Sequence, residues 1–179
     1  MKKSITLFIF LFYVYGAAQV AIGKNSITNN SVSLEFGSDN KGLILPWVSN
    51  TSSVTGAVDG TLVYDLTDKK VKAKYASGWK DFSINTAGTT VDPITSIDGI
   101  TTQNAYTENS EAKVSIGTPT ATDGILVLEN SDQAMILPKV ASPHINIINP
   151  APGMMVYDTV TKQLVFYNGT VWTFWEPAR

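Results

Sequence analysis

Short apolar runs alternate with polar, turn-forming residues along most of this chain. Between Val71 and Tyr75 the apolar positions alternate strictly with Lys72 and Lys74. A period of two places successive side chains on opposite faces of a β-strand, so this pattern predicts one buried and one solvated face. No stretch shows convincing 3.6-residue periodicity. The chain is therefore expected to be all-β.

The apolar runs recur in the same order, 92 to 94 residues further along the chain. Pro46 recurs as Pro138, and Asp65 recurs as Asp158. Repetition at a fixed spacing indicates that one supersecondary unit is used twice. The matching segments are GLILPWV from Gly42 and MILPKV from Met135, GTLVYD from Gly60 and GMMVYD from Gly153, and the tryptophans Trp79 and Trp172 that close the two units.

The second unit has the pattern of a three-stranded antiparallel meander, with strands at residues 154–158, 163–167 and 171–175. Asn168-Gly169 separates the last two runs. This dipeptide predicts a type I′ hairpin turn, which needs positive φ at both central residues. In the first unit Ala76, Ser77 and Gly78 stand before Trp79 instead, and a looser turn is expected there.

The two units differ on the face that the alternation predicts to be solvated. Where the first unit has Lys72 and Lys74, the second has Val165 and Tyr167. A large contiguous apolar face is unusual on a soluble monomer. We expect this face to be covered by another subunit, by the preceding unit or by a ligand.

The predicted fold is all-β, with two repeated small antiparallel β-meander modules at residues 19–82 and 113–179. Residues 83–112 between them are rich in Thr, Ser and Asn and nearly free of aromatic side chains. Compact domains rarely contain about 20 residues without structure of their own. This segment is therefore predicted to be a linker or an extended fibrous segment.

Residues 1–18 have the order of a secretory signal peptide. Lys2 and Lys3 precede an apolar run at residues 5–15, and Gly16-Ala17-Ala18 follows. An apolar run of 11 residues is short of the roughly 20 that a spanning helix needs. The segment predicts an N-terminal signal helix cleaved after Ala18, export to the cell surface or medium, and no membrane span after cleavage.

The amino-acid composition excludes several kinds of site and argues against one class of partner. The chain has no cysteine, which excludes disulfides, thiolate metal sites, a cysteine nucleophile and a lipid-bearing cysteine. Without Lys2 and Lys3, 11 of the 13 basic side chains remain against 15 acidic ones, and this mild acidity argues against nucleic acid as a partner. Modules of about 70 residues are small for independent cores. Help from the other module of the chain, or from other chains in an oligomer, is therefore expected. The leading hypothesis is a homo-oligomer, with a trimer as the first choice.

Aromatic side chains are the main candidates for contact with a ligand or partner. Those near the end of each unit could stack on sugar rings, but they could equally pack within the core of their own module. Trp47 differs because its counterpart in the second unit is Lys139, so the repeated plan does not require an aromatic there. The candidate contact residues are Trp47, Trp79, Tyr167, Trp172 and Trp175.

Catalytic and metal-binding patterns are poor. Asp65 and Asp158 stand where a strand enters a turn, and we expect them to accept hydrogen bonds from backbone amides two residues on. A calcium site assisted by Asp68 is the alternative, although Thr161 replaces that carboxylate in the second unit. The single histidine, His144, is interpreted as a loop residue. No cofactor and no metal are expected.

Glu35 and Glu129 are equivalent by the repeat and could form a carboxylate pair for glycoside hydrolysis if the two modules met face to face. Repetition alone explains both residues more simply. The chain is therefore expected not to be an enzyme.

The ordered motifs resemble a family of secreted β-repeat surface proteins of Bacteroidetes. Similar Leu-Pro, VYD and YNG-W segments occur in tail-fibre-like and adhesin-like proteins, which are typically elongated β-rich trimers. The resemblance implies an exported, non-catalytic surface or fibre protein and assigns no binding residues. Trp47 and Lys139 depart from the arginine usual at their position. The motifs are VAIG at Val20, SLEF at Ser33, KGLILP at Lys41, GTLVYD at Gly60 and a closing GW at Gly78, then VSIG at Val114, LVLEN at Leu126, MILPKV at Met135, PAPGMMVYD at Pro150 and TKQLVFYNGTVW at Thr161.

The sequence is compatible with three candidate functions. The first is a structural or adhesion-type protein of the cell surface that works as a homo-oligomer, with surface polysaccharide or another envelope protein as a further partner. The second is a carbohydrate-binding module that uses exposed Trp and Tyr side chains. The third is a hydrolase with paired carboxylates.

Overall fold

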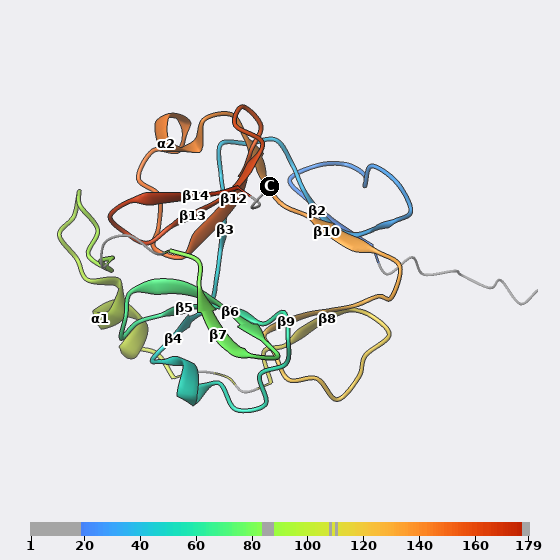
Figure 1. Cartoon of the computed structure of the whole chain (residues 1–179), viewed down its shortest axis with the longest axis horizontal. Helices are drawn as coiled ribbons and strands as arrows, with labels where there is room; N and C mark the ends of the chain where they lie inside the picture. Colours follow the sequence, from blue (N-terminus) through green and yellow to red (C-terminus); the bar gives the residue numbers. More distant parts are fainter. Residues whose placement is uncertain (1–18, 84–87, 108, 110, 177–179) are drawn as a thin grey trace, which may run out of the picture.

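The computed structural model describes residues 19–83, 88–107, 109 and 111–176 (Figure 1). The predicted signal peptide at residues 1–18 lies outside them. The described chain is mostly β, which confirms the predicted class, and its α-helices are the short α1 (Gly99–Asn104) and α2 (Pro143–Asn146). In the described residues no helix is both long enough and apolar enough to cross a membrane.

Two sheets share the same strand plan. In each, a two-residue strand pairs in parallel with the first strand of an antiparallel meander. The second sheet has an additional strand, β3 (Leu43–Ile44), which pairs antiparallel with Met154 and Met155 on the edge of β12 that β11 also uses. The first sheet consists of β4 (Trp47–Val48), β5 (Leu62–Asp65), β6 (Lys70–Tyr75) and β7 (Gly78–Asp81), and the second of β11 (Lys139–Val140), β12 (Met154–Asp158), β13 (Gln163–Tyr167) and β14 (Trp172–Trp175).

Equivalent residues of the two units occupy equivalent places in the sheets. Trp47 pairs with Tyr64 as Lys139 pairs with Tyr157. Lys69 and Lys162, which are 93 positions apart, both adopt left-handed backbone, with φ of 55° and 62°. Sequence repetition therefore extends to strand register and to the conformation of the first meander turn.

The second meander turn differs from the prediction in both units. Gly169 has positive φ (95°) but Asn168 does not, so the turn is not of type I′. Asn168 is buried, and its side-chain oxygen accepts the N–H groups of Thr170 and Val171, both at 2.9 Å. This capping closes a four-residue loop. In the first unit the turn is tighter rather than looser, because Tyr75 pairs directly with Gly78.

The remaining strands form parallel pairs in a solenoid-like stacking. One sheet has the order β1-β2-β10 and the other contains only β8 and β9 (Figure 1). Both lie at the opposite end of the longest axis from α1. The strands are β1 (Val20–Ile22), β2 (Val32–Phe36), β10 (Ala134–Ile136), β8 (Val114–Gly117) and β9 (Leu126–Glu129).

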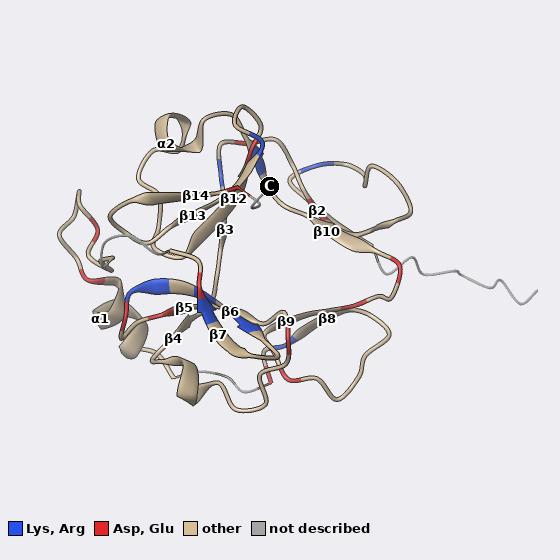
Figure 2. Ribbon diagram, in the orientation of Figure 1, with Lys and Arg blue, Asp and Glu red and all other residues tan. Residues whose placement is uncertain are grey.

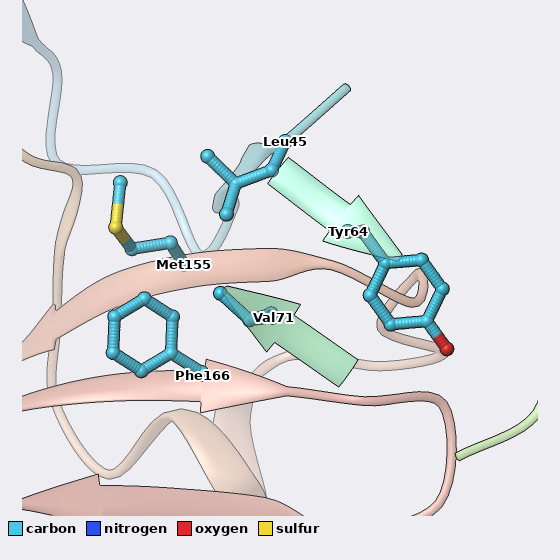
Figure 3. Close-up of a cluster of buried hydrophobic side chains, with 5 residues drawn as sticks. All are labelled: Leu45, Tyr64, Val71, Met155 and Phe166. Carbon is cyan, nitrogen blue, oxygen red and sulfur yellow. The ribbon is translucent and has the colours of Figure 1, made fainter. Parts of the chain in front are cut away.

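The main core lies between the two meander sheets. Its fully enclosed side chains come from both units, with Tyr64 and Val71 on one side and Met155 and Phe166 on the other (Figure 3). Leu45 completes the cluster. The repeated positions face one another, since the residues in and around the cluster include three equivalent pairs: Leu43 with Met135, Leu45 with Leu137, and Phe82 with Trp175.

A second cluster covers the opposite face of the second sheet. Val156 and Val165 are enclosed there by Val140 and by Ile147, which follows α2. This face was expected to need another subunit, the preceding unit or a ligand. That prediction is wrong, because the connection between β11 and β12 folds over the sheet and buries Val165 within its own unit.

The equivalent face of the first sheet is not simply solvated either. Lys72, the counterpart of Val165, is only 8% exposed and forms ion pairs with Asp65 (3.3 Å) and Asp68. Basic and acidic segments accordingly lie close together around β6 and β7 (Figure 2). Although desolvation lowers the pKa of Lys72, hydrogen bonds to Asp68 and Asp65 outweigh it and raise the pKa. The prediction of a solvated Lys72 is therefore wrong, because carboxylates from the adjacent turn enclose its ammonium.

The segment at residues 83–112 includes ordered structure. Asp98 caps α1 by accepting the Ile100 N–H, and it also accepts the Thr90 hydroxyl at 2.7 Å. A Cβ on Gly88 or on Gly169 would lie 1.8 Å from a backbone oxygen of Asn168 or Thr89, respectively. Residues 88 and 89 therefore lie backbone to backbone against the β13–β14 loop, at a separation that only glycine allows.

We predict that Phe166→Ala lowers the free energy of unfolding by about 3–5 kcal/mol, because it leaves a cavity at the centre of the shared core. Guanidinium unfolding followed by circular dichroism measures this. Val160→Ala, at a position that is 61% exposed, is the matched control and should change stability by less than about 0.5 kcal/mol. Equal effects of the two substitutions would contradict the core assignment.

Candidate functional site

Four of the five aromatic candidates pack within the sheets. Trp175 lies in the main core, where its indole N–H donates to the Phe82 carbonyl oxygen at 2.5 Å. The Trp172 and Tyr167 rings contact each other with centroids 5.0 Å apart, at the edge of the second cluster. Trp79 on β7 is half-buried and pairs across the sheet with Lys74.

Trp47 lines a cavity. Its indole N–H donates to the carbonyl oxygen of Pro152 at 2.8 Å, which ties β4 to the second unit. Its ring is tilted against Tyr64, with centroids 5.8 Å apart. A Cβ on Gly99 would lie 2.8 Å from the ring edge, so the start of α1 approaches the indole closely. Trp47 is thus fixed between the two units and α1.

The cavity has a volume of about 490 Å³, within the range typical of small-molecule sites. Its walls come from Trp47, from the segment that carries α1, and from the prolines before β12. Sequence reasoning selected Trp47 but missed the other lining residues. They lie outside the repeated pattern, and no motif connects them. Those with polar or aromatic groups include Asp92, Thr102, Gln103, Tyr106 and Asn149.

The two glutamates of the hydrolase hypothesis each bind their own connecting loop. Glu35 accepts the backbone N–H and the hydroxyl of Thr28, both at 2.6 Å, and forms an ion pair with Lys24 at 2.6 Å. Glu129 accepts the same two groups from Thr120. Within the described chain these carboxylates share no hydrogen-bond partner, and both serve to fix a parallel crossover.

Charge and hydrogen bonding lower the pKa of Glu35 to about 2. The largest cause is the hydrogen bond from Lys24, followed by that from the Thr28 hydroxyl, and together they outweigh desolvation. The Glu35 side chain is only 4% exposed. Its ionised form is therefore part of the folded structure around β2.

Asp65 and Asp158 are turn residues, as the sequence predicted. Asp65 accepts the Thr67 N–H and Asp158 accepts the Val160 N–H, both at 2.8 Å. Each also accepts an N–H from the connection that follows the two-residue parallel strand, from Thr51 or from Ser142. These bonds, with the Thr161 hydroxyl, outweigh desolvation and lower the pKa of Asp158. The two carboxylates thus join the loops at the same end of each sheet.

Metal-binding clusters are not found among the residues that the structure describes. No group of three or more His, Asp and Glu side chains there could hold a metal ion. His144 lies in α2, and its ring meets Phe174 edge-on with centroids 5.6 Å apart. It packs against the second sheet.

One family model matches the chain. Residues 114–177, about a third of the sequence, match a family described as a phage tail-like trimerisation region. The match begins at the first residue of β8 and extends through β14. It supports, at a coarse level, a structural protein of tail-fibre type that forms homo-oligomers. No curated protein and no solved structure matched the chain.

We predict that the stabilisation contributed by Glu35 depends on pH. Because its folded pKa (about 2) is below the ordinary value of 4.5, the contribution is present above pH 4.5 and is lost as pH falls toward 2. The difference in unfolding free energy between the native chain and Glu35→Gln should therefore shrink over this range. Lys24→Met should shift the loss to higher pH. A difference that does not vary between pH 6 and 2 would contradict this role.

Proposed function

We propose that this protein is an exported, non-catalytic structural protein of tail-fibre or adhesin type that assembles as a homotrimer. The match of residues 114–177 to a phage tail-like trimerisation region supports this proposal directly. The basic and apolar order of residues 1–18 supports export. Two packed β-units and the absence of a metal-binding cluster in the described residues agree with a structural role.

The observation that carries the assembly is the two-stranded sheet of β8 and β9. These strands pair in parallel with each other, and the described residues provide no third strand on either edge. Parallel sheets are normally covered on both faces, and two strands alone are marginally stable in water. Two unpaired edges therefore favour completion by further copies of the chain.

Exposed apolar side chains lie on or beside the two-stranded sheet of β8 and β9. Val114 is 55% exposed, and Ile125 and Leu126 at the start of β9 are also exposed. The related sheet of β1, β2 and β10 exposes Val20 and Ile22 on its edge strand. The two parallel sheets occupy the same end of the molecule (Figure 1). This end provides both backbone hydrogen-bonding groups and apolar surface for association.

We expect the chain without residues 1–18 to be a trimer in solution. Sedimentation equilibrium at about 10 µM should give about three times the mass of one chain, since oligomers with closed symmetry have a defined number of copies. The double variant Val114→Lys, Leu126→Lys should shift the protein toward the monomer, because it places charge on the proposed contact.

Ile145→Lys is the matched control for this experiment. Ile145 is 69% exposed on α2, away from the parallel sheets, and its substitution should leave the mass unchanged. Circular dichroism should show that all variants remain folded. A folded monomer of the native sequence at this concentration would exclude the proposed assembly.

A further inference from the structure

The cavity beside Trp47 has two walls that are joined by a hydrogen bond. On one side, the turn at residues 91–98 is closed by a β-bridge between Val91 and Asp98, and α1 follows it directly. On the other side, residues 149–152 lead into β12. The Asn149 amide donates to the Asp92 carboxylate at 3.2 Å, which joins the two walls across 57 positions of sequence. The two walls of this open pocket are therefore held in place relative to each other.

Aromatic groups provide the apolar surface of this site. Trp47 is held in place by its hydrogen bond to Pro152 and by its contact with Tyr64. Tyr106, just after α1, is 78% exposed and has no packing partner among the aromatic contacts of the described residues. One ring is thus fixed and the other is available to a ligand.

Polar groups with oriented side chains lie beside the rings. One Asp92 oxygen accepts the N–H groups of Ile94 and Thr95, both at 2.8 Å, and the other accepts Asn149. These bonds lower the pKa of Asp92, with the Thr95 N–H as the largest cause. Gln103, on α1, lies 3.5 Å from the Trp47 carbonyl oxygen through its amide nitrogen. The amide oxygens of Asn149 and Gln103 accept no hydrogen bond from the described residues.

Charge restricts the ligand. The residues that line the cavity include a carboxylate, Asp92, and no Lys, Arg or His. The segment that carries α1 shows acidic but no basic residues in Figure 2. Phosphates, sulfates and uronic acids would therefore meet a like charge with no cation among the lining residues, although Lys69 donates to the hydroxyl of the lining residue Thr90 at 3.2 Å. A ligand without negative charge, with both an apolar face and many hydroxyl groups, fits this combination.

We propose that this cavity is a binding site for a neutral saccharide. A pyranose ring presents C–H groups on one face, which pack against the face of an aromatic ring, and hydroxyls around its edge, which pair with planar amides and carboxylates. Trp47 and Tyr106 provide the aromatic surface. Asp92, Gln103 and Asn149 provide the hydrogen-bonding groups. The site deepens the proposed surface role by assigning it a class of ligand.

The site is independent of the proposed assembly in position. It adjoins α1, while the parallel sheets lie at the other end of the longest axis (Figure 1). Association through β8 and β9 leaves this end accessible. An oligomer would therefore present several copies of a weak site, which raises the apparent affinity for a polysaccharide with repeated units.

The test uses the mature chain and an array of neutral gluco-, galacto- and manno-configured oligosaccharides, with sulfated and uronic acid analogues as the charged set. We expect binding to at least one neutral series, with a change in tryptophan fluorescence on titration. Tyr106→Ala and Trp47→Ala should each weaken binding about tenfold or more, as for a central aromatic contact.

Tyr106→Ala is the decisive variant because an exposed side chain can be removed without loss of folding, whereas Trp47 also packs against Tyr64. Tyr75→Ala, at an exposed tyrosine of β6 outside the cavity, is the matched control and should bind as the native chain does. No binding to any neutral oligosaccharide at up to about 10 mM, or equal binding by Tyr106→Ala and Tyr75→Ala, would overturn the proposal. Preference for the charged set would overturn it as well.

The mass of each variant separates this proposal from the proposed assembly. Tyr106→Ala should lose saccharide binding and keep the oligomeric mass. The Val114→Lys, Leu126→Lys variant should lose the mass and keep binding of a single oligosaccharide in solution. A monomeric native chain that binds saccharide would exclude the trimer alone, and a trimer without binding would exclude the saccharide site alone.

Discussion

The burial of one apolar layer between two repeated sheets is the interaction on which the rest of the structure depends. Each meander is too small to enclose its own inner face, and each uses the other as its cover. Directional bonds fix the relative position of the two sheets, because Tyr64 donates to the Asn168 carbonyl oxygen and Trp175 donates to that of Phe82. The duplicated unit is thus half of a core, and the duplication supplies the other half.

The two copies have diverged where their surroundings differ. Val165 is covered by the α2 connection, and its counterpart Lys72 is enclosed by carboxylates, so the same strand position is satisfied by packing in one sheet and by charge in the other. Trp47 reaches across to Pro152, whereas its counterpart Lys139 is exposed. Because only the first of these positions faces the other unit, only there does an aromatic side chain gain a partner.

Much of the local structure follows from the sequence. Alternation and repetition predict the strands, and Asp65 and Asp158 behave as turn residues because their hydrogen bonds are made within a few positions. The sequence pattern does not predict contacts between residues that lie far apart in the chain. The burial of Lys72, the cover over Val165 and the glycine contacts of Gly88 all depend on which segments meet in space. The type I′ turn predicted at Asn168-Gly169 does not form, because the Asn168 side chain caps the loop and positive φ is not needed at that residue. The cavity beside Trp47 joins segments that no periodicity connects.

The placement of β3 has a consequence for how the two halves of the chain are held together. This strand precedes the whole first sheet in the chain, yet it pairs with Met154 and Met155 of the second. Leu45, which follows it, donates its N–H to the Gly153 carbonyl oxygen at 3.0 Å. Residues 43–45, which precede the first sheet, are therefore bonded to residues 153–155 of the second sheet. Separating the two halves would require breaking these backbone hydrogen bonds as well as the shared core, so the two halves are expected to open as one cooperative unit.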